Sequence, residues 1–369
     1  MNALDIFMLL GGLALLLAGA NTLVRGAEHL ARAVGISPLV VGLTVVAFGT
    51  SSPELAIATS ASLSGNGALA VGNVVGSNIA NVLLILGLAA VIAPLLVTKQ
   101  LIRIDVPFMI ALSLLFYLMA SNGSIERWEG LLLVLIAVVY TVFLVRQSKK
   151  ETRDREQGAE SRAEESNEEG SRKINLWRDL LLIIFGLVML ILGSKLLVTG
   201  AINIAQALKV SELIIGLTVV AIGTSAPEIA TTVIAAIKGQ REMAVGGVIG
   251  SNIFNILLVL GASASIAPDA IQVPGSALAF DIPVMIAVAL ACLPIFFVGF
   301  KIMRWEGGLF LVYYIAYTLY LILQTKHHDS LPMFSYVLSW YAIPLTVVTL
   351  GVLCVQAWFK YRKHGHPEH

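Results

Sequence analysis

The chain contains 369 residues, of which 57% are hydrophobic and 13% are charged, whereas soluble domains carry about a quarter charged residues. Its mean hydropathy of +0.87 comes from apolar runs that recur along the whole chain, each long enough to cross roughly 30 Å of hydrocarbon. The composition therefore excludes an ordinary water-soluble domain. The net charge of +1, with basic residues scattered over short loops, gives no reason to expect a nucleic-acid partner.

The apolar runs predict an all-α integral membrane protein whose partner is the lipid bilayer. Backbone groups in lipid must be satisfied within helices or within a closed barrel, and these runs are continuous rather than alternating apolar and polar, which excludes the barrel. In chain order the expected spans are 5–24, 38–63, 69–93, 105–121, 129–146, 177–198, 213–237, 243–268, 281–300, 307–325 and 334–359.

The basic residues predict the orientation of these spans. If the N-terminus lies outside the cell, 20 of the 24 Lys and Arg residues fall on the cytoplasmic side, as the positive-inside rule requires. We therefore expect a multi-pass protein of the cell membrane with its C-terminus in the cytoplasm. Segment 147–176 mixes Lys and Arg with Glu and has few apolar residues, so we expect a disordered cytoplasmic linker.

An internal repeat organises the chain. Residues 42–87 align with residues 216–261 without a gap, and 27 of the 46 aligned positions are identical. Each copy belongs to a unit of five spans, and an odd number of spans forces the second unit to enter the membrane from the opposite face. We expect two inverted five-helix repeats, which is a common plan of transporters. The expected parts are residues 1–146, the linker 147–176, residues 177–325, and an extra C-terminal transmembrane helix with a basic tail, 326–369.

Polar motifs interrupt the central spans at matching positions. One motif reads Gly-Thr-Ser-x-Pro-Glu and the other reads Gly-Ser-Asn-Ile-x-Asn, and their spacing of three and four residues places several side-chain oxygens on one helix face. Their oxygen-bearing residues are Thr50, Ser51, Glu54, Ser77 and Asn81 in the first copy, and Thr224, Ser225, Glu228, Ser251 and Asn255 in the second. All of them fall near the middle of the bilayer.

The two glutamates are the strongest functional signal, because a carboxylate at the centre of a membrane helix costs about 2.5 kcal/mol or more. Each glutamate follows a proline, Pro53 or Pro227, and a proline inside a helix frees the carbonyl four residues earlier and breaks the helix. The freed carbonyls would be those of Gly49 and Gly223. Such irregular backbone is tolerated only where it is buried in protein or lines a cavity. Packing of a membrane helix is the ordinary role of a lone serine or asparagine, but twin glutamates after prolines favour an ion site.

The oxygen-only ligand set predicts a hard cation. Two oxygens from each of Glu54 and Glu228, with the carbonyls of Thr50 and Thr224, give about six ligands, and calcium takes 6–8. The neutral oxygens of Ser51, Ser77, Ser225 and Ser251, with those of Asn81 and Asn255, could hold sodium beside the same carboxylates. Without a cation the two carboxylates would repel each other, so we expect protons to compete with the ions. No bound cofactor is expected.

Several other residues receive structural interpretations. Gly72 with Gly76, and Gly246 with Gly250, form GxxxG pairs that predict close helix packing. The two Arg-Trp-Glu-Gly tetrapeptides should mark helix ends, with Trp128 and Trp305 as interfacial anchors. Asp105 and Asp281 end their spans, and a capping or solvated role is expected for both.

At these motifs the sequence resembles the calcium/cation antiporter superfamily, specifically the sodium/calcium exchanger family and its prokaryotic members. The resemblance covers roughly residues 5–325 and implies ten core helices. It implies calcium held by Glu54, Glu228, Thr50 and Thr224, and sodium held by Ser51, Ser77, Ser225, Ser251, both glutamates, and the backbone carbonyls of Ala47 and Ala221. Asn255 stands where potassium-dependent exchangers carry an Asp, which weakens a potassium-coupled interpretation.

The leading hypothesis is a secondary active antiporter, not an enzyme, that exchanges calcium for sodium by alternating access. A calcium/proton antiporter is the alternative for the coupling ion. A passive cation channel would also need rings of oxygen ligands, but the inverted repeats favour alternating access. An intramembrane hydrolase is a weaker hypothesis still, because all six histidines lie in loops or tails. The sequence does not predict the oligomeric state.

Overall fold

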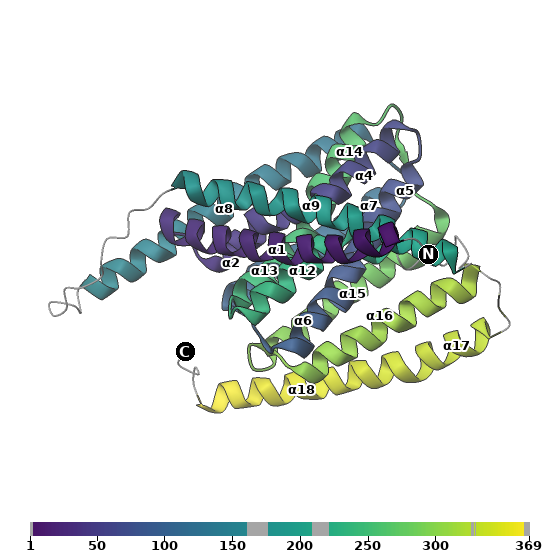
Figure 1. The fold of residues 1–369 in the computed structure, drawn as a ribbon. Helices are drawn as coiled ribbons and strands as arrows, with labels where there is room; N and C mark the ends of the chain where they lie inside the picture. Colours follow the sequence, from purple (N-terminus) through teal and green to yellow (C-terminus); the bar gives the residue numbers. More distant parts are fainter. Residues whose placement is uncertain (1–2, 161–175, 209–220, 326–327, 329, 365–369) are drawn as a thin grey trace.

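The fold is a bundle of long helices, shown in Figure 1. The computed structural model describes residues 3–160, 176–208, 221–325, 328 and 330–364. Apart from four two-residue strands, the regular structure in this part of the chain is helical, and nine of its helices are long and apolar enough to cross a membrane, with a bent helix pair as a tenth. The prediction of an all-α membrane protein is confirmed.

The first half of the chain contains five helical runs. Its elements are α1 (Ala3–Val34), α2 (Pro38–Val41), η1 (Gly42–Val46), α3 (Ala47–Thr50), α4 (Ser52–Leu63), α5 (Gly67–Ala80), η2 (Asn81–Leu86), α6 (Gly87–Ile92), β1 (Leu95–Leu96), η3 (Leu101–Asp105), α7 (Val106–Ala120), β2 (Ser124–Ile125) and α8 (Arg127–Glu160), where η marks a π-helical turn.

The second half repeats this order. Its described elements are α9 (Leu176–Ala207), α11 (Ala221–Thr224), α12 (Ala226–Ile237), α13 (Arg241–Phe254), η5 (Asn255–Leu260), α14 (Gly261–Ile266), β3 (Ile271–Gln272), η6 (Ala277–Asp281), α15 (Ile282–Phe297), β4 (Lys301–Ile302), α16 (Arg304–Thr325), α17 (Leu331–Val337), η7 (Leu338–Ala342) and α18 (Ile343–His364). The predicted span 213–237 is described only from Ala221, so the total of eleven spans stays a prediction.

The two spans that carry the Gly-Ser-Asn-Ile-x-Asn motif form the centre of the bundle. In the most apolar window of span 241–266, 94% of the residues are buried, and in span 67–92 the share is 72%. The corresponding share is 17% for α16 and 6% for the span that begins at Leu331. Polar motifs on the two central spans are therefore shielded from lipid on nearly all sides.

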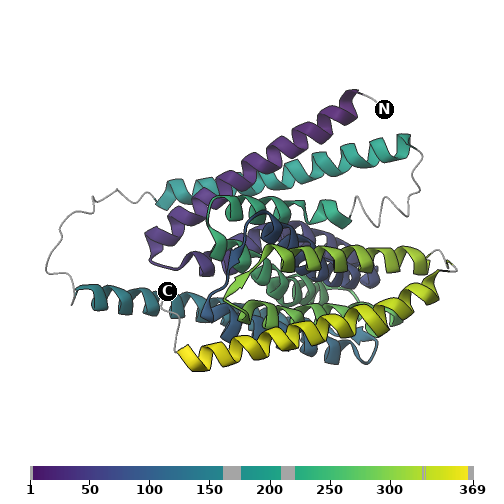
Figure 2. The ribbon, with the colours of Figure 1, turned by 90° about the horizontal axis from the view of Figure 1, so that it is seen from below.

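Helices α1 and α9 form an antiparallel pair that lies along one side of this centre (Figures 1 and 2). A Cβ atom on Gly12 would meet the Gly193 carbonyl oxygen at 2.8 Å, and one on Gly19 would meet the Gly186 carbonyl oxygen at 2.9 Å. Glycine at these crossing points lets two helix backbones approach closely. Figure 2 shows the pair on the opposite side of the bundle from α17 and α18.

Glycines of the second repeat bring α13 against the first repeat. A Cβ atom on Gly246 would meet the Leu39 carbonyl oxygen at 2.7 Å, and one on Gly250 would meet the Leu43 carbonyl oxygen at 2.6 Å. The GxxxG prediction is thus confirmed for this pair. For Gly72 and Gly76 the matching partner segment, near 213–217, lies outside the described residues.

Short strands and arginines join the ends of the two halves. Strand β1 pairs with β4 and β2 pairs with β3, both antiparallel. Arg127, at the start of α8, donates from Nε to the Ala267 carbonyl at 2.8 Å, just beyond the end of α14. Trp128 and Trp305 are exposed, and both tetrapeptides begin helices, as expected of interfacial anchors.

Two details differ from the sequence predictions. Helix α8 continues to Glu160, so residues 147–160 are helical rather than disordered; a helix can be rich in charges of both signs because opposite charges three or four residues apart in the sequence support it. Residues 161–175 of the expected linker lie outside the described residues. Asp105 is completely buried and accepts a hydrogen bond from the Tyr140 hydroxyl at 2.9 Å, so its expected capping or solvated role is wrong.

Candidate ion-binding site

Both glutamates lie at helix breaks in the middle of the bundle. The helix pair 38–50 and 52–63 bends by 46° at Ser51, and a matching break at Ser225 separates α11 from α12. Glu54 and Glu228 stand in the first turn after these breaks and are 1% and 4% exposed. A helix N-terminus is favourable for negative charge, so each break supplies part of the stabilisation that its carboxylate needs.

The two breaks face each other across the pseudo-symmetric centre. Helix α3, which ends at Thr50, packs against α12, which carries Glu228. The Thr50 Oγ1 atom also lies 3.5 Å from the Ser251 Oγ atom. Residues from both copies of both motifs therefore meet at one place.

Buried oxygen atoms at this place accept no hydrogen bond from another described residue. They are the Ser51 and Ser225 hydroxyl oxygens, both carboxylate oxygens of Glu54, Oε2 of Glu228, and the Oδ1 atoms of Asn81 and Asn255. Buried polar atoms in native proteins are nearly always paired. A cluster of oxygen atoms, three of them from carboxylates, can be satisfied by a cation or by protons.

The other predicted ligands, and one carbonyl that was expected to be free, lie in the following surroundings. Ser77 is buried, Thr224 is half-buried, and Ala221 begins α11. The Ala47 carbonyl accepts from the Ser51 backbone N–H at 3.0 Å and from the Thr50 hydroxyl at 3.4 Å. The Gly223 carbonyl, expected to be free, accepts a hydrogen bond from the Ser194 hydroxyl at 2.7 Å, so that carbonyl is not a free ligand.

Two asparagines that the sequence reasoning passed over belong to the same place. Asn78 and Asn252 are buried, and each accepts a hydrogen bond from the side-chain amide of Asn255 or Asn81 in the other repeat. The signal was present in the sequence, because the middle Asn of Gly-Ser-Asn-Ile-x-Asn occurs in both copies. The motif alone gives this Asn no role separate from that of its neighbours.

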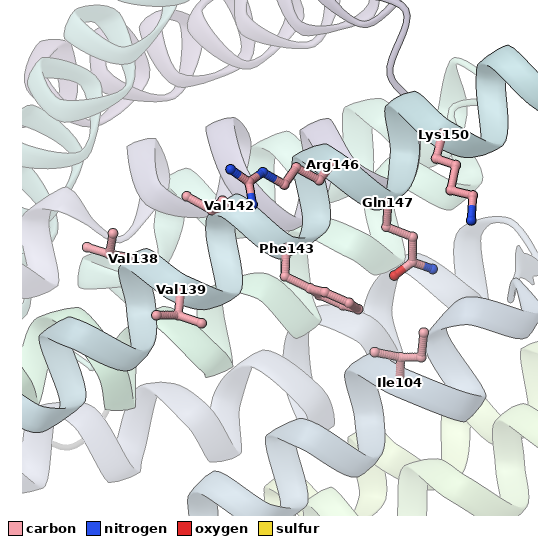
Figure 3. Close-up of a pocket in the computed structure, with 8 residues that line it drawn as sticks. All are labelled: Ile104, Val138, Val139, Val142, Phe143, Arg146, Gln147 and Lys150. Atoms are coloured by element: carbon pink, nitrogen blue, oxygen red, sulfur yellow. The ribbon is translucent and has the colours of Figure 1, made fainter.

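Surface cavities lie elsewhere. A groove of about 800 Å³ runs along α8 beside η3, with the apolar residues Val138, Val142 and Phe143 at one end and Arg146 and Lys150 at the other (Figure 3). Within the described residues there is no cluster of three or more His, Cys, Asp or Glu side chains that could hold a metal ion. The candidate site therefore rests on two carboxylates and on neutral oxygens.

Known proteins resemble the chain over both halves. The family model for the sodium/calcium exchanger protein matches residues 4–146 and 179–323. The putative antiporter CaxA of Alkalimonas amylolytica is 40% identical over 287 residues, which is 77% of this chain and 88% of that protein. The sodium/calcium exchanger MaX1 of Methanosarcina acetivorans is 34% identical over 312 residues, covering 77% of this chain and 89% of that one.

Solved structures show the same likeness in three dimensions. The sodium-calcium exchanger NCX_Mj, soaked with 10 mM Na⁺ and no Ca²⁺, superposes with a TM-score of 0.71 at 31% identity, over 85% of this chain and 98% of that one. The family match ends at residue 323, so the helices α17 and α18 lie beyond it. The matched segments include both glutamates and both motifs. The chain belongs to the sodium/calcium exchanger family.

Proposed function

We propose that the protein is a secondary active antiporter that exchanges calcium for sodium by alternating access, with Glu54 and Glu228 as the shared charge of its ion site. The observation that carries this proposal is the pair of buried glutamates at matching helix breaks, with buried oxygens that have no hydrogen-bond partner among the described residues. One calcium ion neutralises both carboxylates. Sodium ions can do the same one at a time, so the two kinds of ion exclude each other.

The ligand chemistry supports calcium as the divalent substrate. Carboxylate, hydroxyl and carbonyl oxygens are hard ligands, and calcium accepts 6–8 of them in flexible geometry, whereas magnesium keeps several of its waters. In this proposal Thr50 and Thr224 complete the calcium site through their carbonyls. The serines at 51, 77, 225 and 251, with the carbonyls of Ala47 and Ala221, complete the sodium sites. The transported ions need no additional cofactor.

Family membership supports exchange rather than passive conduction. Relatives carry the names putative antiporter and sodium/calcium exchanger, and paired helix breaks at mid-membrane are typical of transporters that expose one site to each side in turn. We also propose that the N-terminus lies outside the cell and the C-terminus in the cytoplasm, because basic residues concentrate on the opposite side from the N-terminus.

Ion flux in sealed vesicles tests the function. Purified protein is reconstituted, the vesicles are loaded with sodium and diluted into sodium-free buffer, and uptake of radioactive calcium is measured. We expect uptake that stops when the sodium gradient is collapsed. Uptake driven by a pH gradient alone would assign the coupling to protons instead, and calcium conductance that needs no counter-ion would assign a channel.

A further inference from the structure

Four buried asparagines link the two repeats at the candidate ion site. Asn81 donates from Nδ2 to Oδ1 of Asn252 at 2.9 Å, and Asn255 donates from Nδ2 to Oδ1 of Asn78 at 3.0 Å. Each of the four side chains is at most 3% exposed. The pairs are related by the repeat, since residue 78 corresponds to residue 252 and residue 81 to residue 255.

A second layer of contacts fixes the direction of these bonds. Asn78 donates from Nδ2 to the Asn252 backbone carbonyl at 3.3 Å and to the Met285 sulfur at 3.5 Å. Asn252 donates from Nδ2 to the Met109 sulfur at 3.5 Å. A backbone carbonyl can only accept. Rotating the Asn78 amide by 180° would therefore place its oxygen against the Asn252 carbonyl oxygen and its nitrogen against the Asn255 amide nitrogen.

The consequence concerns Asn81 and Asn255, the two asparagines whose amides donate to Asn252 and Asn78. With their amide nitrogens engaged by Asn78 and Asn252, Asn81 and Asn255 keep buried Oδ1 atoms that have no partner among the described residues. Asn81 begins η2, which packs against the Glu228 helix α12, and Asn255 begins η5, which packs against the Glu54 helix α4. Each amide nitrogen donates within the network, and the Oδ1 atoms of Asn81 and Asn255 remain as acceptors for a cation.

We propose that Asn78 and Asn252 are positioning residues, which hold the Asn255 and Asn81 side-chain oxygens toward the transported ion without touching it. This inference rests on the proposed function. It adds that the neutral ligands of each repeat are oriented by the other repeat. A purely structural role, as hydrogen-bonded contacts between helices, is the competing account, and it predicts a loss of stability without a specific loss of ion affinity.

A double-mutant cycle separates the two accounts, because residues that act through one another are not additive. The readout is the sodium concentration that displaces half of the calcium bound to the purified full-length protein. Asn78→Leu keeps the side-chain volume and removes the acceptor for Asn255. We expect the displacing sodium concentration to increase about tenfold, which corresponds to the loss of one hydrogen bond. In an Asn255→Leu background the same change should add less than about twofold.

The chain supplies a matched control and a milder variant. The Asn203 amide donates to Asp5 between α9 and α1 and shares no partner with Asn78, so combining Asn78→Leu with Asn203→Leu should give additive effects. Asn78→Ala removes the same acceptor with a smaller side chain, should give a similar increase, and serves if the leucine variant fails to fold. Met285→Leu removes only the sulfur contact and should have the smallest effect.

Two results would overturn the positioning role. Full additivity of Asn78→Leu and Asn255→Leu would show that Asn78 does not act through Asn255. A lower melting temperature with unchanged sodium displacement would show a purely structural network. Calcium binding is measured at equilibrium, so these outcomes are distinct from a failure of sodium-driven flux in the parent protein, which would instead reject the proposed function.

Discussion

The two helix breaks are nearly identical in sequence and differ in how they are braced. At the second break, Ser194 donates to the Gly223 carbonyl at 2.7 Å, and Thr231 donates to the Pro227 carbonyl at 2.8 Å. The first repeat carries Ala20 and Ile57 at the corresponding positions, and neither side chain can donate a hydrogen bond. The second break is thus held by these two hydroxyl groups, whereas at the first break Ser52, which stands in place of Ala226, donates to the Phe48 carbonyl at 3.1 Å.

The first break has a different support. Asn73 donates from Nδ2 to the Glu54 backbone carbonyl at 3.1 Å, and its counterpart in the second repeat is Gly247. Among the described residues, both carboxylate oxygens of Glu54 are buried without a hydrogen-bond partner, whereas for Glu228 this holds only for Oε2. Two copies of one motif can therefore share the same ligand residues while different hydrogen bonds hold the surrounding backbone.

Removing either charge should have the largest effect and should be the same at both breaks. Glu54→Gln and Glu228→Gln keep the shape of the side chain but leave one carboxylate for a divalent ion. We expect sodium-driven calcium uptake to fall to the level of protein-free vesicles, with the variants still folded by size-exclusion chromatography. Normal uptake by either variant would remove that glutamate from the site.

Adding a methyl group at the two break glycines should expose the difference in bracing. A Cβ atom on Gly223 would clash with Val198, whose branched side chain is stiff, whereas one on Gly49 would meet the end of the flexible Leu187 side chain at 2.5 Å. Overpacking costs about 1–3 kcal/mol, so Gly223→Ala should lower the melting temperature more than Gly49→Ala. Equal losses would mean that the two breaks tolerate movement equally.

The serine hydroxyls should separate the two kinds of ion. Ser51→Ala removes an oxygen with no partner, so its effect on stability should be small, whereas Ser251→Ala also removes the neighbour of Thr50 at 3.5 Å. We expect both variants to raise the half-saturating sodium concentration severalfold while calcium affinity changes little. Flux assays at varied sodium measure this, and an unchanged sodium response would place the monovalent sites elsewhere.

The bracing hydroxyl itself should have the smallest effect. Ser194→Ala frees the Gly223 carbonyl, and a single hydrogen bond contributes about 1 kcal/mol, so the melting temperature should fall by a few degrees. Thr231→Val, which removes the other hydroxyl while keeping the side-chain shape, is the matched comparison. If neither variant changes the melting temperature, the hydroxyl groups do not stabilise the second break, and the difference between the breaks contributes nothing to the free energy of unfolding.

The sequence was sufficient to predict the class of fold and the centre of the site. Continuous apolar runs predict membrane helices, and a carboxylate after a proline at mid-span is too costly to be incidental, so Glu54 and Glu228 could be found without a structure. The break at Ser51 follows from Pro53 in the same way. These features depend on local sequence, which the repeat displays twice.

The sequence could not predict contacts that depend on how distant helices meet. Ser194 lies 29 positions before the carbonyl that it holds, and an alignment of the repeats shows it only as a difference from Ala20. The Asn78 to Asn255 bond joins residues 177 positions apart. The capping role predicted for Asp105 was wrong because its position at a span end is also typical of a cap, and the sequence does not show that the Tyr140 hydroxyl donates to it.

Competition between calcium and sodium at equilibrium tests the central claim most directly. Radioactive calcium is bound to the purified protein and titrated with sodium chloride, with choline chloride at equal ionic strength as the control. We predict full displacement by sodium but not by choline, and no specific calcium binding in Glu54→Gln or Glu228→Gln. Calcium binding that resists sodium, or that survives loss of either carboxylate, would contradict a shared ion site between the two breaks.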